Sequence, residues 1–457
     1  MRRFSVFLPW VAAGVGFVAT VLILYPGQYP FDSAYQLWQA RNGQFNNQSP
    51  VTMTALWWLL LRLTANPATL FCLNLAMFWA GLALCFAAVS VRDAVRVALV
   101  FTCGMAPLAL VEMAHVLTDA HLAAVLVLAT GLAAWGLAES RRIPLLASLC
   151  LLVYAGAVRY NALAAMVPPG VVIAGAWAAT ERAGTRRMTA LAATLMACLP
   201  LATGVALDRA LTTQRVTVWP TIALWDLAAV SVDTGTLLLP AFTHGPGLSV
   251  DELRATGGYD PTANTFLFQA TRSGMRDGLL EPYTADELRS LRRTWIDAML
   301  RHPGAYARHR LRTFWLLVGP HRGPTQGVAY FVSRTRYKDD PPLPAAIDQK
   351  VQDRFYALAA ALRPGWMFAA LPYLGLGLLA LVLGWRRRDQ PLARLGAAFA
   401  GGALLYAVGL LPLAPAADLR YLTWPIVAGP LTLALVLFGC RRHRHRARLA
   451  VTDISIA

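Results

Sequence analysis

Charge is scarce in this 457-residue sequence, of which only 14% is Asp, Glu, Lys or Arg and 57% is hydrophobic. With a mean hydropathy of +0.49, this composition argues against a set of soluble domains and predicts a polytopic membrane protein. The net charge of +17 could indicate a nucleic-acid partner. The arginines, however, stand in short clusters between apolar runs, which is typical of membrane topology signals, so we expect no nucleic-acid partner.

Disulfide patterns and catalytic sequence motifs are also missing. All six cysteines lie in or at the edge of apolar runs, which argues against a disulfide framework. The sequence has no Gly-rich phosphate loop, no HExxH and no GxSxG. An Asp-Thr-Gly tripeptide begins at Asp233, but it occurs once and aspartic proteases need two such carboxylates. We see no internal repeat of the kind that inverted-repeat transporters carry.

Ten apolar runs are long enough to cross a bilayer, which takes roughly 17–25 residues. They cover residues 8–25, 66–89, 94–112, 118–138, 143–160, 162–180, 188–207, 366–385, 391–413 and 421–440. With a cytoplasmic N-terminus, every arginine cluster between them falls on the inner side. We therefore expect an all-α polytopic fold with about ten transmembrane helices and both termini cytoplasmic, in a bacterial inner (plasma) membrane.

The polar segments divide the chain into four parts. These are an N-terminal transmembrane module (1–207), a periplasmic domain (208–365), C-terminal transmembrane helices (366–440) and a basic cytoplasmic tail (441–457). Helical patterns at 284–301 and 304–318 predict a mainly helical, mixed periplasmic domain. The second helix has an apolar face suited to the membrane surface.

The first outer loop, residues 26–65, carries one acidic residue among aromatic side chains. Asp32 lies between Phe31 and Tyr35, just outside the first apolar run. A carboxylate at that place indicates a functional site. The alternative is that Asp32 or Ser33 only begins a short interfacial helix that runs through Trp38. Residues 51–63 are too short to span comfortably and predict a second interfacial helix.

Ionisable groups gather on the outer side of the predicted bundle. The candidates are Asp32, Glu112, Asp119, Arg159, Asp226, Asp418 and Arg420. Some have a structural alternative. Asp119, after Thr118, could cap a helix, Arg159 could anchor the end of a span, and Asp418 could form a local ion pair with Arg420.

Short motifs in these segments resemble those of the C-type fold glycosyltransferases. The motifs are Asn46-Asn47-Gln48-Ser49-Pro50, Leu117-Thr118-Asp119, Arg159-Tyr160-Asn161, Trp225-Asp226-Leu227 and Asp418-Leu419-Arg420-Tyr421. The layout is similar to that of the protein O-mannosyltransferase and lipid A aminoarabinose transferase group, particularly its uncharacterised bacterial members. The Asp-Glu pair of the mannosyltransferases is absent, because Ser33 follows Asp32.

The resemblance implies an inverting enzyme that moves a sugar from a polyprenyl-phosphate donor to an envelope glycan, lipid or protein acceptor on the periplasmic face, among membrane lipids. Asp32 would be the general base, with Asp119 beside it. The implied donor-phosphate site is Arg159, Tyr160, Asn161, Arg420 and Tyr421. Residues that contact the acceptor or support the site would be Gln36, Asn47, Asp226 and Asp418. No cofactor is certain, although Asp32 and Asp119 could hold a divalent cation.

A lipid or polysaccharide transporter or flippase is the alternative function, and a scaffold for envelope assembly is a second one. A transporter is expected to carry ionisable residues near the middle of several spans. Here they gather at span ends, and a scaffold has no need for paired acidic and basic groups. The sequence therefore favours the enzyme.

Overall fold

The computed structural model describes residues 4–179, 185–255, 258–269, 274–276, 282–320 and 334–439. This part of the chain is almost entirely helical. Its strands are two short ones, β1 (Phe45–Asn46) and β2 (Thr212–Gln214), which pair in parallel. The predicted cytoplasmic tail, residues 441–457, lies outside the described residues.

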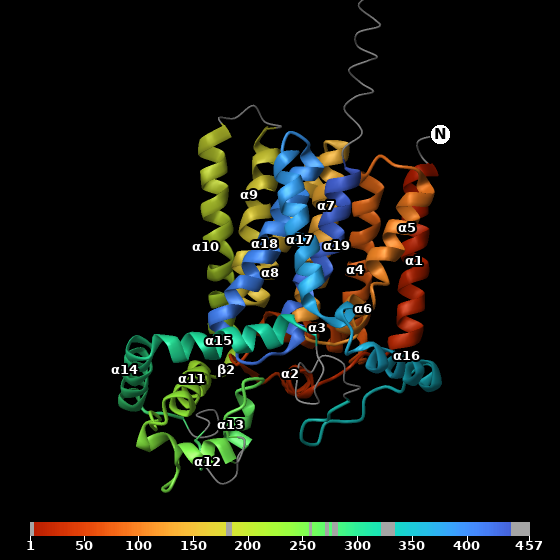
Figure 1. The fold of residues 1–457 in the computed structure, drawn as a ribbon. Coiled ribbons are helices and arrows are strands. Elements are labelled where there is room, and N and C mark those ends of the chain that lie inside the picture. Colours follow the sequence, from red (N-terminus) through yellow and green to blue (C-terminus); the bar gives the residue numbers. More distant parts are fainter. Residues whose placement is uncertain are drawn as a thin grey trace, which may run out of the picture.

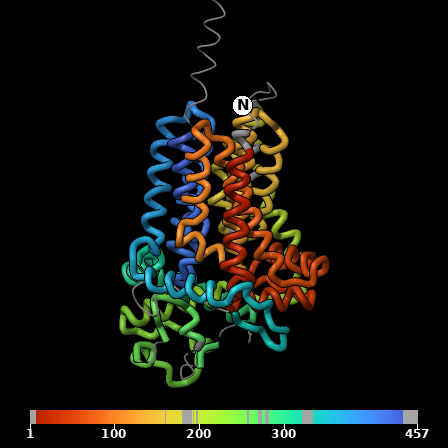
Figure 2. The backbone as a smooth tube through the Cα atoms, turned by 90° about the vertical axis from the view of Figure 1, so that its right-hand side faces the viewer, coloured from red at the N-terminus to blue at the C-terminus, as the bar shows by residue number. Residues whose placement is uncertain are grey.

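Long helices form a bundle, and a layer of shorter helices lies across one end of it (Figure 1). The bundle consists of α1 (Phe4–Leu24), α4 (Thr69–Ala88), α5 (Asp93–Gly104), α6 (Pro107–Met113), α7 (Thr118–Glu139), α8 (Arg142–Val158), α9 (Leu163–Ala179), α10 (Thr185–Leu211), α17 (Ala370–Arg386), α18 (Pro391–Leu413) and α19 (Thr423–Phe438). Each of the ten predicted apolar runs falls mainly on these helices. Both ends of the described chain lie at the far end of the bundle (Figures 1 and 2).

The described helices include five that are long and apolar enough to cross a membrane. They are Phe7–Leu24, Thr69–Ala88, Thr118–Glu139, Pro391–Leu413 and Leu419–Phe438. The bent pair α5 and α6 makes a sixth if it is counted as one span, and α8, α9 and α17 are shorter apolar helices. The molecule is therefore a multi-pass membrane protein with five or six such helices.

The third predicted span, residues 94–112, is not a single helix. It consists of α5 and α6, which are bent by 58° relative to each other. Pro107 begins α6. A proline lacks an N–H group to donate and disfavours the helical conformation of the preceding residue, Ala106. The sequence did not indicate this bend, because the run is continuously apolar across the break.

Close helix contacts in the bundle depend on glycine. A Cβ atom on Gly81 of α4 would lie 2.5 Å from the carbonyl oxygen of Val127, and one on Gly131 of α7 would lie 2.4 Å from that of Gly81. Such close backbone approach is a main source of helix association in lipid. It holds α7, which carries Asp119 in its first turn, firmly inside the bundle.

We call the layer of shorter helices the head. It consists of α2 (Phe31–Asn42), α3 (Val51–Thr64), α11 (Trp219–Thr234), α12 (Val250–Ala255), α13 (Thr265–Gln269), α14 (Ala285–Arg301), α15 (Pro303–Val318) and α16 (Gln349–Leu362). The described residues also include four 3-10 turns: η1 (Tyr160–Ala162), η2 (Ala241–Thr243), η3 (Trp366–Phe368) and η4 (Leu419–Leu422). The predicted helices 51–63, 284–301 and 304–318 are α3, α14 and α15.

The part of the head around α11 to α14 has an apolar core separate from that of the bundle, to which Leu227 of α11 and Leu291 of α14 contribute. Leu37 of α2 and Trp57 of α3 belong instead to the apolar core of the bundle. Its helix α15 runs along the end of the bundle (Figure 1). There the guanidinium of Arg310 donates to the carbonyl oxygen of Ala414, just after α18, at 2.8 Å. The head is therefore packed on the bundle rather than tethered to it.

Candidate functional site

Four separate segments bring charged side chains together at the head end of the bundle. Arg420 Nη1 lies 2.6 Å from Asp32 Oδ2 of α2, and Arg420 Nε lies 2.7 Å from Asp418 Oδ2. Arg159, at the end of α8, places Nη1 2.5 Å from Asp119 Oδ1 of α7. We call Asp32, Asp119, Arg159, Asp418, Arg420 and Tyr421 the Asp32 cluster.

Tyr421 joins the two ion-paired halves of the Asp32 cluster. The guanidinium carbon of Arg420 lies 5.1 Å from the centre of the Tyr421 ring, and that of Arg159 lies 5.6 Å from it. Both arginines are therefore within the range of cation–π attraction to one ring. The cluster is one continuous site and not two isolated ion pairs.

Helix ends position the two arginines. Arg159 follows the last residue of α8 in an extended conformation, and its Nε donates to Asn161 Oδ1 at 3.2 Å. Asp418 precedes η4, where its side chain accepts from the backbone N–H of Arg420 at 3.3 Å. Because the chain leaves helical geometry at both points, each arginine is positioned by a local hydrogen bond beside a break between helices, made by the side chain of Arg159 and by the backbone of Arg420.

The expected short helix at Asp32 is present as α2, but neither Asp32 nor Asp119 caps a helix. Helix α7 begins after Leu117 and α2 after Pro30, and neither has a side-chain cap hydrogen bond. Asp119 pairs with Arg159 instead, and Asp32 pairs with Arg420. The expected local pair of Asp418 and Arg420 is present, and it is one part of the larger cluster. Helix α2 also extends past the expected end at Trp38, to Asn42.

The Asp32 cluster is accessible from one side. The side chain of Asp32 is 43% exposed and that of Arg420 19%, whereas that of Asp119 is only 3% exposed. Among the described residues, Oδ1 of Asp32 has no hydrogen-bond partner. An open carboxylate oxygen can accept a proton, and the adjacent arginines can bind an anion.

Glu112 of α6 is an acidic residue of the site for which the sequence analysis proposed no role. Its side chain is buried, and Oε2 accepts from Thr423 Oγ1 at 3.2 Å. Oε1 has no hydrogen-bond partner in the described part of the chain. The break before Pro107 orients α6 so that Glu112 reaches Thr423. Thr423 is the first residue of α19 and lies close in the chain to Arg420 and Tyr421. No sequence signal distinguishes Thr423 from any other threonine at the start of an apolar run.

The connection between α6 and α7 is buried next to the Asp32 cluster and excludes water from that side. Burial lowers the pKa of His115 to about 4, an effect that the nearby Asp418 carboxylate only partly opposes. His115 is therefore neutral at neutral pH, and its Nδ1 lies 2.9 Å from the carbonyl oxygen of Val111. Low polarity of this kind strengthens the electrostatic interactions next to it.

Asp226, which the resemblance assigns to the acceptor side, lies in a different environment. Its Oδ2 accepts from Arg310 Nη2 at 2.7 Å and from Trp295 Nε1 at 3.0 Å. Its side chain is only 1% exposed. Asp226 thus holds α11, α14 and α15 together, and the geometry gives no support to a role in acceptor contact.

The remaining predicted residues have mixed placements. Gln36 lies on α2 one turn after Asp32, is buried, and its Oε1 has no partner among the described residues. Asn47 Oδ1 accepts from the backbone N–H of Val216 at 2.7 Å, which joins the first loop to the segment after α10. The side chain of Tyr160 lies outside the part of the structure that is described.

A divalent cation does not fit the two carboxylates that the sequence nominated for it. No group of three or more His, Cys, Asp or Glu side chains in the described residues is placed to hold a metal ion. Asp32 and Asp119 each bind an arginine, at 2.6 and 2.5 Å. Each carboxylate thus already has a guanidinium as its positive partner, and the two do not form a shared set of ligands for a cation.

The fold and the site define a multi-pass membrane protein with an accessible, charged cluster at one end of its helix bundle. Comparison with known proteins finds no matching family model, no matching curated protein and no matching solved structure. The functional argument therefore rests on the residues of this chain.

Proposed function

We propose that this protein is an integral membrane glycosyltransferase of the C-type fold, which moves a sugar from a polyprenyl-phosphate donor to an acceptor on the periplasmic face of a bacterial inner (plasma) membrane. The observation that carries the proposal is the Asp32 cluster, in which a half-exposed carboxylate lies 2.6 Å from Arg420, and Arg420 and Arg159 both lie over the ring of Tyr421. In this proposal ten spans place both termini in the cytoplasm and the head in the periplasm, with α8, α9, α10, α17 and the bent pair α5–α6 among the spans.

The proposed reaction is a single displacement. The acceptor hydroxyl oxygen attacks the anomeric carbon of the sugar, the bond from that carbon to the phosphate oxygen breaks, and polyprenyl phosphate leaves. Asp32 takes the proton of the hydroxyl as general base. Attack opposite to the leaving group inverts the anomeric configuration.

Two arginines suit the leaving group. Arg159 and Arg420 would hold the donor phosphate and neutralise the charge that develops on it. Without a donor, Asp119 and Asp418 bind these guanidinium groups and keep them oriented. Such preorganised charge is the main means by which an enzyme stabilises a transition state of this type.

Lipid and glycan profiling of a deletion strain tests this function. We expect a glycosylated polyprenyl phosphate to accumulate and one envelope component to lose a sugar, with both changes reversed by the intact gene. An unchanged profile would overturn the proposal. An assay of sugar transfer in leaky membrane vesicles distinguishes a transferase from a transporter. Substrates cross a leaky membrane without a transporter, but sugar transfer still requires the transferase.

A further inference from the structure

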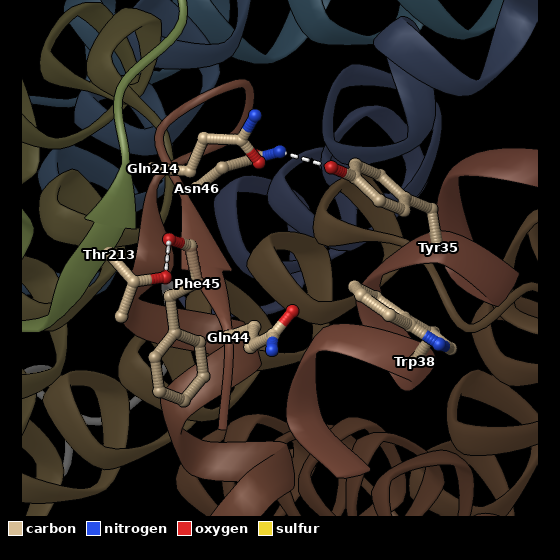
Figure 3. Close-up of a pocket in the computed structure, with 7 residues that line it drawn as sticks. All are labelled: Tyr35, Trp38, Gln44, Phe45, Asn46, Thr213 and Gln214. Atoms are coloured by element: carbon tan, nitrogen blue, oxygen red, sulfur yellow. Dashed lines mark hydrogen bonds between the residues drawn. The ribbon is translucent and has the colours of Figure 1, made fainter. Parts of the chain in front are cut away.

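A pocket of about 390 Å³ lies beside α2 in the head. Tyr35 and Trp38 of α2 form one wall, and the paired strands β1 and β2 form the opposite one (Figure 3). The strand residues are Phe45, Asn46, Thr213 and Gln214, and Gln44 completes the lining. The volume falls within the range of about 300–1,000 Å³ that is typical of small-molecule sites.

Hydrogen bonds fix the shape of this pocket. The side-chain amide of Asn46 donates to the hydroxyl of Tyr35 across it. Gln39 Oε1 accepts from the backbone N–H of Asn46 at 2.8 Å, and Thr213 Oγ1 donates to the carbonyl oxygen of Phe45 at 2.9 Å. The pocket is thus formed before any ligand binds, which lowers the conformational cost of binding.

Two residues outside the lining, Tyr337 and Lys338, contact the aromatic wall. The ring of Trp38 packs edge-on against Tyr337, with centroids 5.5 Å apart, and the ammonium group of Lys338 lies 4.3 Å from the centre of the Trp38 ring. Tyr337 also packs against Tyr35, at 4.7 Å. The extended segment after residue 334 therefore fixes the two rings of α2 that line the pocket.

The lining selects the chemical class of ligand. None of its seven side chains is ionised at neutral pH, so the lining itself offers no cation to a phosphate or carboxylate, and the nearby ammonium group of Lys338 lies over the Trp38 ring and is not part of the lining. The amides of Gln44 and Gln214 are exposed and make no hydrogen bond with the described residues. An aliphatic chain would leave these amides without partners. Ring faces beside free amides suit a ligand with one apolar face and several hydroxyl groups.

We propose that this pocket binds a neutral saccharide, and that this saccharide is part of the acceptor. The inference rests on the proposed function and extends it by making the acceptor a glycan rather than a lipid or a protein. Asp32 and Tyr35 are three residues apart on α2, so their side chains are neighbours on one face of the helix. A glycan stacked on Tyr35 lies next to the proposed general base.

Binding to the full-length protein in lipid nanodiscs tests this pocket. The probes are neutral gluco-, manno- and galacto-trisaccharides, with a galacturonate trisaccharide and an unglycosylated dodecapeptide for comparison. We expect at least one neutral series to bind and the other two probes not to. Trp38→Ala and Gln214→Ala should each weaken that binding about tenfold. Gln214→Ala changes an exposed amide, so its effect does not depend on altered packing.

Trp385→Ala is the matched control, because Trp385 is 66% exposed and belongs to α17, at the far end from the head. It should bind the neutral trisaccharide as the wild-type protein does. Absence of binding by every neutral series would overturn the inference, and so would equal binding by wild-type, Trp38→Ala and Gln214→Ala proteins.

The transfer assay separates this inference from the proposed function. Trp38→Ala should raise the KM for a glycan acceptor and leave kcat unchanged at saturation, whereas Asp32→Asn should bind the trisaccharide normally without transfer. If the wild-type protein binds the saccharide at this pocket but transfers no sugar, the pocket stands and the proposed function fails. If it transfers sugar to a lipid or protein acceptor without binding any neutral saccharide, the proposed function stands and the inference fails.

Discussion

The Asp32 cluster and the surroundings of Asp226 use the same residue types in opposite ways. Each combines an aspartate with an arginine and an aromatic side chain. The Asp32–Arg420 pair is 43% and 19% exposed, whereas the Asp226–Arg310 pair is 1% and 3% exposed. A ligand can reach the first carboxylate, whereas both oxygens of the second face protein groups inside the head, Oδ1 at 3.2 Å from His309 Nε2 and Oδ2 at 2.7 Å from Arg310 Nη2. Exposure, and not residue type, distinguishes a functional site from a structural ion pair.

The largest expected effect is on catalysis. Asp32→Asn keeps the shape of the side chain but cannot take a proton, so we expect transfer by the purified protein to fall about 10²- to 10⁴-fold. The thermal unfolding midpoint in detergent should hardly change, because a substitution at an exposed position typically alters stability by about 0.5 kcal/mol or less. Wild-type transfer by the folded variant would refute the assignment of Asp32 as general base.

The opposite profile is expected for the buried pair. Asp226→Asn leaves the guanidinium of Arg310 buried without its carboxylate, and breaking a buried ion pair in this way costs about 3–5 kcal/mol. The unfolding midpoint should fall strongly. Combining the change with Arg310→Met should recover part of the loss, because it removes the unpaired charge. A variant as stable as the wild type would show that this network does not brace α11 and α15.

The sequence predicts the bundle well because membrane helices follow from the length and apolarity of single segments. It predicts the local pair of Asp418 and Arg420 for a similar reason, since the two residues are neighbours in the chain. The role of Asp226 could not be predicted, because its partner Arg310 is 84 residues away in the chain. The Trp-Asp-Leu motif also does not indicate whether its carboxylate is exposed or buried.

The pocket and the bend were beyond prediction for other reasons. Strands β1 and β2 are very short and lie far apart in the chain. They are too short to show the alternation of apolar and polar residues by which a strand is recognised in a sequence. Pro107 was visible, but apolar residues continue on both sides of it, and hydropathy alone does not distinguish a bent pair of helices from a straight span.

A smaller effect on stability is expected when the pH is lowered, through His309. Burial lowers the pKa of His309, which contacts Asp226, below its ordinary value, although the carboxylate partly opposes the shift. The folded protein therefore binds this proton less readily than the unfolded chain does. The stability due to neutral His309 is present above about pH 6.5 and is lost as the pH falls below it. In His309→Gln, the unfolding midpoint should depend less on pH between 7 and 5, about the range of histidine titration. An unchanged pH dependence would exclude His309 as a contributor.

The smallest effect is expected at a second aspartate–arginine pair between the same two helices. Asp233 of α11 pairs with Arg308 of α15, but their side chains are 35% and 66% exposed. The hydrogen bond from Arg308 lowers the pKa of Asp233, so any stabilisation is already present at neutral pH and is lost only in acid. Water and salt screen such a pair, and exposed pairs contribute little. Asp233→Asn should therefore leave the unfolding midpoint at neutral pH and moderate salt unchanged, and at most a slight decrease should emerge at low salt. Because Asp226→Asn alters the same chemistry between the same helices, the two variants differ mainly in burial. A decrease for Asp233→Asn as large as that for Asp226→Asn would show that burial does not decide which pair braces the head.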